Sequence, residues 1–198
     1  MVLGISLIIF QVMNPVVASA VVPGLGELIQ GEKSKARAFF IIEGSIWLSY
    51  FGFNYFGHKI DQSARAFAIK HTGGNPTRND DDYFEALEDY YSSDLYNLEI
   101  ERDASLFWPE DPERQQEYIE ENGYFGTDEW EWDTLSNKNH YWQRRKDARE
   151  NYRRAAFMPG FAIINRIVSI IDVVLFPQEK KFGIDTGPGR IGLYYKFQ

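Results

Sequence analysis

The sequence predicts an all-α protein in which two packed apolar helices, expected to span a membrane, flank an acidic helical module rich in aromatic residues. Three observations lead to this prediction. Apolar residues make up 44% of the 198 residues and are gathered into separate runs. Within those runs, polar side chains recur at helical spacing. Between the runs lies an acidic region: the whole chain has a net charge of −8, and residues 57–154 alone carry −10.

The first segment, residues 1–20, has features of a secretory signal peptide. An apolar run from Val2 to Met13 is followed by Ala18-Ser19-Ala20, whose two alanines fit a signal-peptidase site. No lysine or arginine precedes the run, so an uncleaved N-terminal apolar helix and an ordinary buried helix stay open as alternatives. A signal peptide or an anchor would place the protein at a membrane.

Residues 21–56 are predicted to form a glycine-rich turn followed by a membrane helix. The run Ala38 to Phe56 has 19 residues, and as a helix it would be about 28 Å long, close to the thickness of a bilayer core. In the turn that precedes it, glycines permit positive φ angles. The turn motif comprises Pro23, Gly24, Gly26 and Gly31.

The second membrane helix is predicted at residues 155–176. This run has 22 residues and contains Pro159-Gly160, which should kink or break the helix near its start. Ionisable residues occur in both runs, Glu43 in the first and Arg166 and Asp172 in the second. These charges leave open the alternative that both runs are core helices of a soluble protein.

The segment 57–154 between the runs is predicted to be an all-helical module with an aromatic core. It contains 16 of the 32 aromatic residues of the chain and few aliphatic ones. One helix is expected from an N-cap at Asn79 to Leu98, and a second from Asp111 to Gly123. A third should begin near Ser136.

The tail, residues 177–198, differs from the rest of the chain. The stretch from Phe182 to Arg190 is rich in glycine and is predicted to be a loop. Ile191 to Phe197 has the composition of a strand. Because one strand cannot form a barrel, we expect a short strand-like tail.

Composition and motifs argue against several classes of function. An acidic module repels phosphate, so no nucleic-acid partner is expected. The chain has no cysteine, which removes thiolate chemistry and cysteine metal sites. Gly26 to Ser34 departs from a phosphate-binding loop by one residue, the acidic Glu32. The three histidines lack metal-ligand spacing: His58, His71 and His140. We therefore predict no catalytic, cofactor-binding or metal-binding residue.

The polar residues within the apolar runs carry more information. In the first run Glu43 and Asn54 fall on one helix face, and in the second Asn165 shares a face with Ser169 and Asp172. In lipid, an unpaired charge costs at least about 2.5 kcal/mol, so these faces should meet, with Arg166 as the candidate partner of Glu43. The predicted intramembrane polar interface comprises Glu43, Asn54, Asn165, Arg166, Ser169 and Asp172.

Two short segments resemble an uncharacterised family of bacterial membrane proteins that is classed as a domain of unknown function. Pro23 to Glu27, followed by Gly31-Glu32, is similar to the family's PGxGQ…GE pattern, with Glu27 in place of the usual glutamine. Ile164 to Asp172 is similar to its Asn…Asp apolar helix near the C-terminus. The resemblance implies membrane helices and a location in the bacterial cell envelope, and it implies no activity.

We therefore expect a non-enzymatic membrane protein of structural or assembly type, in contact with membrane lipid, whose acidic module docks to a protein partner. An alternative is a small-molecule or lipid-binding protein, or a transporter component, that uses the polar interface between the helices. A third class, a membrane-embedded hydrolase or transferase, would need paired acids that face a cleft.

Overall fold

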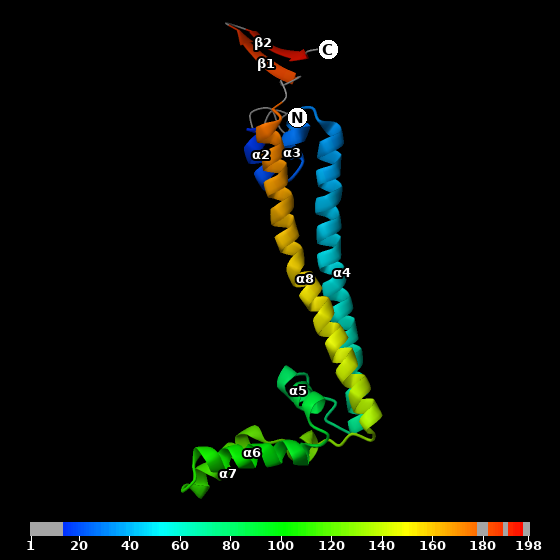
Figure 1. The fold of residues 1–198 in the computed structure, drawn as a ribbon, viewed down its shortest axis with the longest axis vertical. Helices are drawn as coiled ribbons and strands as arrows, with labels where there is room; N and C mark the ends of the chain where they lie inside the picture. The colour runs from blue at the N-terminus through cyan, green and yellow to red at the C-terminus, as the bar shows by residue number, and fades with distance from the viewer. Residues whose placement is uncertain (1–13, 178–181, 188–189, 196–198) are drawn as a thin grey trace. The chain divides into compact units, whose positions relative to one another are not determined.

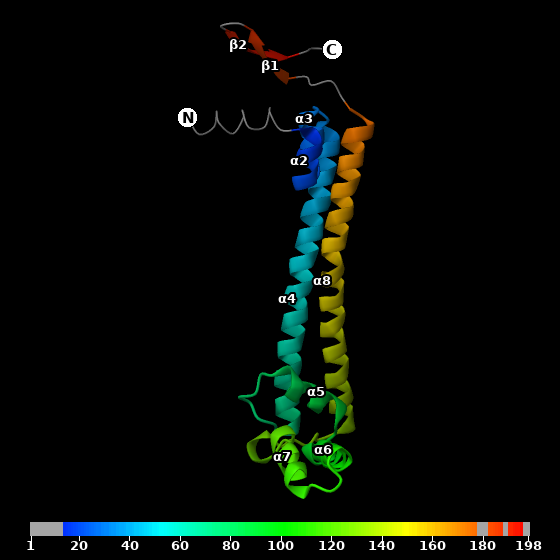
Figure 2. The ribbon, with the colours of Figure 1, turned by 90° about the vertical axis from the view of Figure 1, so that its left-hand side faces the viewer.

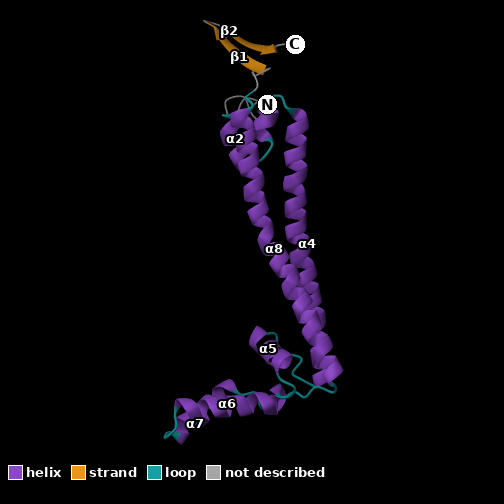
Figure 3. Cartoon of the chain, viewed as in Figure 1, coloured by secondary structure: helices purple, strands orange, loops and turns teal. Residues whose placement is uncertain are grey.

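The computed structural model describes residues 14–177, 182–187 and 190–195, and it confirms the all-α class (Figures 1 and 3). The apolar run before residue 14 lies outside this range. Contacts divide the chain into two compact units. Unit 1 comprises Met1–Phe53 and Arg154–Gln198, and unit 2 comprises Asn54–Arg153. Two long helices, α4 (Lys33–Thr72) and α8 (Leu135–Leu175), contribute residues to both units.

In unit 1, two short helices pack beside the first part of α4 and the last part of α8 (Figures 1 and 2). Helix α2 (Pro15–Val21) begins at Asn14, whose side chain accepts a hydrogen bond from the Val16 amide, with proline in the first turn. Helix α3 (Leu25–Ile29) follows Gly24, which has φ +93°. A left-handed residue between the two helices reverses the chain direction, and glycine adopts this conformation without strain.

Helix α8 continues through Pro159, so of the predicted kink or break at Pro159-Gly160 the break does not occur. The proline removes one backbone hydrogen bond of the helix. Buried residues on both sides of it, Ala155 and Ala162, hold the same face of α8 inside unit 1. This packing outweighs the loss of a single bond.

One described helix, α8, is long and apolar enough to cross a membrane, where the sequence predicts two. Only 22% of its apolar window is buried inside the protein, whereas a core helix of a soluble protein would be mostly buried. Helix α4 falls short because its run includes Glu43, Asn54, one tryptophan and two tyrosines, which lower the mean hydropathy.

Unit 2 contains three further α-helices and a short 3₁₀ helix: α5 (Asp81–Asp89), α6 (Ser93–Phe107), α7 (Pro112–Asn122) and η1 (Gly126–Asp128). The expected N-cap at Asn79 is one residue early, because the carboxylate of Asp80 accepts the capping bond from the Tyr83 amide. For α7 the prediction is confirmed: Asp111 caps it and Gly123 closes it.

The single helix predicted from residue 79 to 98 is wrong, because the chain leaves the helix at Tyr90 and restarts after Ser92. The cause is a segment distant in sequence. The Ser93 amide donates to the Trp130 carbonyl at 2.9 Å, and the Trp132 amide donates to the Tyr91 carbonyl at 3.0 Å. These bonds replace the helical bonds that the Tyr91 carbonyl and the Ser93 amide would otherwise make.

The core of unit 2 is aromatic, as predicted from its composition. The Trp132 indole donates to the Leu87 carbonyl at 2.9 Å, and the Tyr141 hydroxyl donates to the Phe84 carbonyl at 2.8 Å. Burial raises the pKa of Tyr141, which keeps its hydroxyl a neutral donor. The buried residues of this core are Ala64, Ala68, Tyr83, Phe84, Ala86, Leu87, Trp130, Trp132 and Tyr141.

The tail contains two strands where the sequence predicts one. Strand β1 (Phe182–Gly187) pairs antiparallel with β2 (Arg190–Tyr195), with Phe182 opposite Tyr195. The stretch predicted to be a loop is therefore mostly the first strand of a hairpin. An isolated strand would leave its backbone N–H and C=O groups without hydrogen-bond partners. Pairing of the two strands supplies these partners, so a second strand accompanies the predicted one.

Candidate functional site

Among the described residues of unit 1, the most deeply buried ionisable side chain is Glu27 on α3, which is 0% exposed. Its carboxylate is bound by two hydroxyl groups from other helices. Ser19 on α2 donates to Oε2 at 3.0 Å, and Ser169 on α8 donates to Oε1 at 2.7 Å. The carboxylate therefore joins three helices at one point, through hydrogen bonds that have little competition from water.

The glycine turn completes this cluster with backbone donors. The Gly26 amide donates to the Ser19 hydroxyl at 3.1 Å, and the Gly24 amide donates to the Ser169 hydroxyl at 3.0 Å. Each hydroxyl thus accepts from the backbone and donates to Glu27, so its bonding capacity is largely used. We call this set, Ser19, Gly24, Gly26, Glu27 and Ser169, the Glu27 cluster.

Two of the turn glycines are required by space, and Gly24 is required by its backbone angle as well, φ +93°. A Cβ on Gly26 would lie 2.2 Å from the Pro15 carbonyl oxygen, and a Cβ on Gly24 would lie 2.7 Å from that of Ala36. Of the other motif residues, Pro23 is fully buried and Gly31 has φ +87°. The motif that the sequence identifies as a turn is therefore also the backbone of a polar site.

A second cluster surrounds Glu43 on α4, whose side chain is 13% exposed. Arg166 of α8 forms an ion pair with it at 3.0 Å, and the Asn165 amide donates to Oε2 at 3.0 Å. Within α4, the Trp47 indole donates to Oε1 at 2.9 Å. The structure thus places Arg166 beside Glu43, as the sequence analysis expected.

A third polar contact links the ends of the same helices. The ammonium group of Lys35 on α4 lies 3.0 Å from both carboxylate oxygens of Asp172 on α8. The Gln30 amide donates to the Val173 carbonyl at 3.2 Å. Lys35 on the neighbouring helix is therefore the partner of Asp172.

The six predicted interface residues therefore do not form one stripe. Asn165 and Arg166 meet Glu43, Ser169 belongs to the Glu27 cluster, and Asp172 binds Lys35. Asn54 belongs to unit 2. Sequence reasoning missed Ser19, Gln30 and Lys35, which lie outside the apolar runs. For Glu27, one feature of the sequence indicated a role: it stands at the glutamine position of the PGxGQ pattern that the turn resembles.

The position of Ser19 bears on the predicted signal peptide. Ala18 and Ser19 are both fully buried in α2, and Ser19 holds Glu27. Cleavage after Ala20 would remove one of the two hydroxyl groups that bind this carboxylate. The apolar part of the predicted signal, residues 2–13, lies outside the described residues.

The outer surface of unit 1 is apolar, in contrast to this polar interior. On α4, Leu48 is 76% exposed, and on α8, Phe157 is 63% and Ile163 is 58% exposed. Many other large apolar side chains on α2, α4 and α8, and one just after the end of α8, face outward in the same way. They include Val17, Val21, Phe40, Ile41, Ile42, Phe51, Phe161, Ile164, Ile167, Val168, Ile171, Val174, Leu175 and Phe176.

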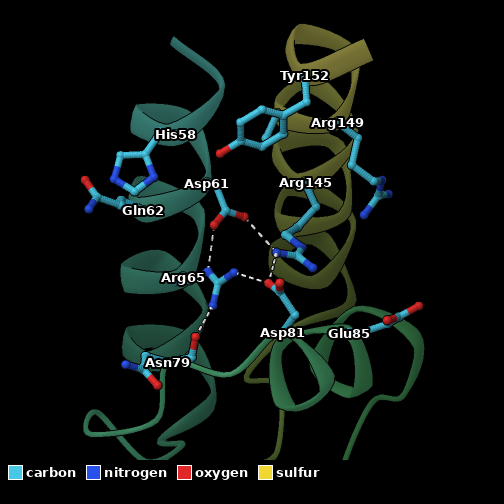
Figure 4. A pocket seen from close by; sticks show the side chains of 11 residues that line it. His58, Asp61, Gln62, Arg65, Asn79, Asp81, Glu85, Arg145, Arg149 and Tyr152 are labelled. Atoms are coloured by element: carbon cyan, nitrogen blue, oxygen red, sulfur yellow. Dashed lines mark hydrogen bonds and ion pairs between the residues drawn. The ribbon is translucent and has the colours of Figure 1, made fainter. Parts of the chain in front are cut away.

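Unit 2 contains a polar cavity of about 780 Å³ among α4, α5 and α8, shown in Figure 4. Asp61 is central to it, bound by Arg65 and by Arg145, each at 2.7 Å. Arg65 also pairs with Asp81 on α5. Behind the cavity wall, buried Glu88 accepts two hydrogen bonds from Arg149, at 2.6 and 2.7 Å.

Charges around this cavity are balanced. Three guanidinium groups and three carboxylates line it, those of Arg65, Arg145, Arg149, Asp61, Asp81 and Glu85. The hydrogen bonds to Glu88 raise the pKa of Arg149, as expected for a cation held by a buried carboxylate. These guanidinium groups bind Asp61, Asp81 and Glu88, and the contacts hold α4, α5 and α8 together.

No family model matches this chain, and neither a curated protein nor a solved structure does. The function must therefore be argued from the arrangement of the side chains. In unit 1 that arrangement joins helices through buried polar contacts and presents an apolar outer surface.

Replacing Glu27 with glutamine should have a small, measurable effect. The amide would place a donor where two serine hydroxyls now donate, so one hydroxyl would lose its acceptor. We expect the free energy of unfolding to fall by about 1–2 kcal/mol, measured by chemical denaturation in detergent. The partly exposed Glu32, in the same turn, provides the control Glu32→Gln, which should cost less. Equal effects would mean that the serine contacts contribute no stability.

Proposed function

We propose that this chain is a membrane protein of a bacterial envelope, with a structural or assembly role rather than an enzymatic one, and that unit 1 lies in the bilayer. The observation that carries the proposal is the reversed polarity of unit 1. Glu27, Glu43 and Asp172 are turned inward and bound, while leucine, isoleucine and phenylalanine side chains cover the outside.

Water would oppose this arrangement, whereas lipid favours it. Monomeric soluble proteins rarely expose contiguous apolar patches of more than a few hundred Å², and here exposed apolar residues follow α8 from Phe157 to Leu175. In lipid, charged groups must be satisfied within the protein. We propose that α4 crosses beside α8, because Glu43 and Lys35 on α4 find their partners on that helix.

The contacts support a structural role for the polar groups. In the Glu27 cluster, the carboxylate is fully buried and each serine hydroxyl has both a donor and an acceptor. Such buried contacts hold membrane helices together and fix their register. The envelope location is supported by the resemblance of the turn to the PGxGQ pattern of bacterial membrane proteins. In this turn Gly24 and Gly26 occupy positions that exclude a side chain.

An alkaline carbonate wash of membranes from cells that express the full chain tests the proposal. We expect the protein to stay in the membrane pellet and to be released only by detergent, because the apolar surface of unit 1 is in contact with lipid. A peripheral membrane protein in the same sample provides the control and should be released. Recovery of the chain in the wash would contradict the proposal.

A specific observation favours lipid binding as a second candidate function. An apolar groove of about 320 Å³ lies between α4 and α8 and is lined by Phe39, Ile42, Ile46, Phe161, Ile164, Asn165 and Val168. Its composition fits an acyl chain better than a polar solute. Ile164→Trp should fill the groove and lower the amount of lipid retained in native mass spectrometry, whereas Ile163→Trp, which lies outside it, should not. Equal retention would exclude the groove as a binding site.

A further inference from the structure

Helix α6 of unit 2 has two apolar faces, and only one of them is used in folding. Its inner face is buried and includes Ile100 and Ala104. On the opposite side of the helix, Leu95, Leu98 and Leu106 are 50%, 59% and 68% exposed. A surface helix normally presents polar residues on the side that faces away from the core. The packing of unit 2 therefore does not explain why leucine occupies these three exposed positions.

The three leucines form a continuous stripe along the helix. They occupy positions i, i+3 and i+11, and Arg102 fills position i+7 between them. We call Leu95, Leu98, Arg102 and Leu106 the outer face of α6. Spacing of this kind is used where one amphipathic helix packs on another.

Acidic residues border this face on both sides. By helical position, Asp94 and Glu101 lie along one edge, and Glu99 and Asp103 lie along the other. Arg102 pairs with Glu99, which leaves the surroundings strongly acidic. The whole α6–α7 segment, residues 93–122, contains ten acids and two bases and so has a net charge of −8, equal to that of the full chain.

We propose that the outer face of α6 binds an amphipathic helix of a partner protein, in which an apolar stripe is flanked by lysine and arginine. The inference rests on the assembly role proposed above and names the chemistry of the partner. Leucines supply buried area, and the acidic edges select a basic partner and repel acidic ones. A second copy would bring an equally acidic face, and an anionic lipid surface would be repelled in the same way.

The test uses the full chain in detergent and a fluorescently labelled synthetic peptide. The peptide has about 18 residues, with leucines in a helical stripe and lysines on both flanks. A scrambled peptide of the same composition, which has the charge without the stripe, is the first control. We expect fluorescence anisotropy to show binding of the striped peptide that is at least about tenfold tighter than that of the scrambled one.

Variants identify the face that binds. The double variant Leu98→Ser/Leu106→Ser should weaken binding of the striped peptide at least about tenfold, whereas Leu135→Ser, at a leucine 61% exposed elsewhere in unit 2, should leave it unchanged. Equal binding of the two peptides, no effect of the double variant, or association of the chain with itself through this face would overturn the inference. The carbonate wash of the same variants reports separately on the membrane proposal, so the two can fail independently.

Discussion

Alanine in place of Gly26 should lower the free energy of unfolding by about 3 kcal/mol or more. The added methyl would lie 2.2 Å from the Pro15 carbonyl oxygen, 2.3 Å from the Ser19 hydroxyl and 2.9 Å from a methyl of Val173. The Pro15 oxygen cannot move away unless the backbone shifts, and the Ser19 hydroxyl cannot rotate away without breaking the Glu27 cluster. We expect a large fall in the melting temperature of the detergent-purified protein.

Gly44 provides the matched control for this substitution. It also lies in unit 1, and a Cβ added there meets nothing within 4 Å. Alanine at this position should stabilise helix α4 by about 0.5–1 kcal/mol, because glycine is the poorer helix former. If both variants melt at the same temperature, the close packing of α3 against α2 and α8 does not exist.

Loss of the Glu43 side chain should be comparably severe. Glu43→Ala leaves Arg166 without its 3.0 Å partner and removes the closer acceptor of the Asn165 amide, which keeps only the Phe39 carbonyl at 3.4 Å. By analogy with other buried ion pairs, the free energy of unfolding should fall by about 3–5 kcal/mol, and Glu43→Gln should cost less. The measurement is thermal unfolding in detergent.

A double-mutant cycle measures the interaction energy between Glu43 and Arg166 apart from their contacts with other residues. If the two charges interact, Glu43→Ala/Arg166→Ala should be less destabilised than the sum of the two single variants. Lys35→Ala, whose side chain is 39% exposed and pairs with Asp172 instead, provides the control. Its effect should add independently to that of Glu43→Ala. Additive losses for Glu43 and Arg166 would contradict the ion pair.

Features that depend on local chemistry could be predicted from the sequence. The cap at Asp111, the aromatic core of unit 2 and the pairing of Glu43 with Arg166 follow from residue type and helical spacing. Helical spacing also placed Asn165, Ser169 and Asp172 on one face of α8, and all three bind partners within unit 1.

Features that depend on distant contacts could not be predicted. The end of α5 at Tyr90 is set by bonds from residues 130–132, and the continuity of α8 through Pro159 is set by its packing. The hydrogen bonds of the Glu27 cluster join residues up to 145 positions apart, and three of its members had the pattern of a cleavage site or of a turn. No spacing within one segment reveals a site built in this way.

The lipid contact of α8 is the central claim, and cysteine labelling tests it most directly. The chain has no cysteine, so a single introduced thiol is the only target for a membrane-impermeant maleimide. Ile167→Cys, at an outward position of α8, should stay unlabelled in intact membranes and react only after detergent is added. Gln143→Cys, on the same helix in unit 2, should react once membranes are opened without detergent. Equal labelling of both positions before detergent would show that the outer face of α8 lies in water, and the proposed membrane role would be wrong.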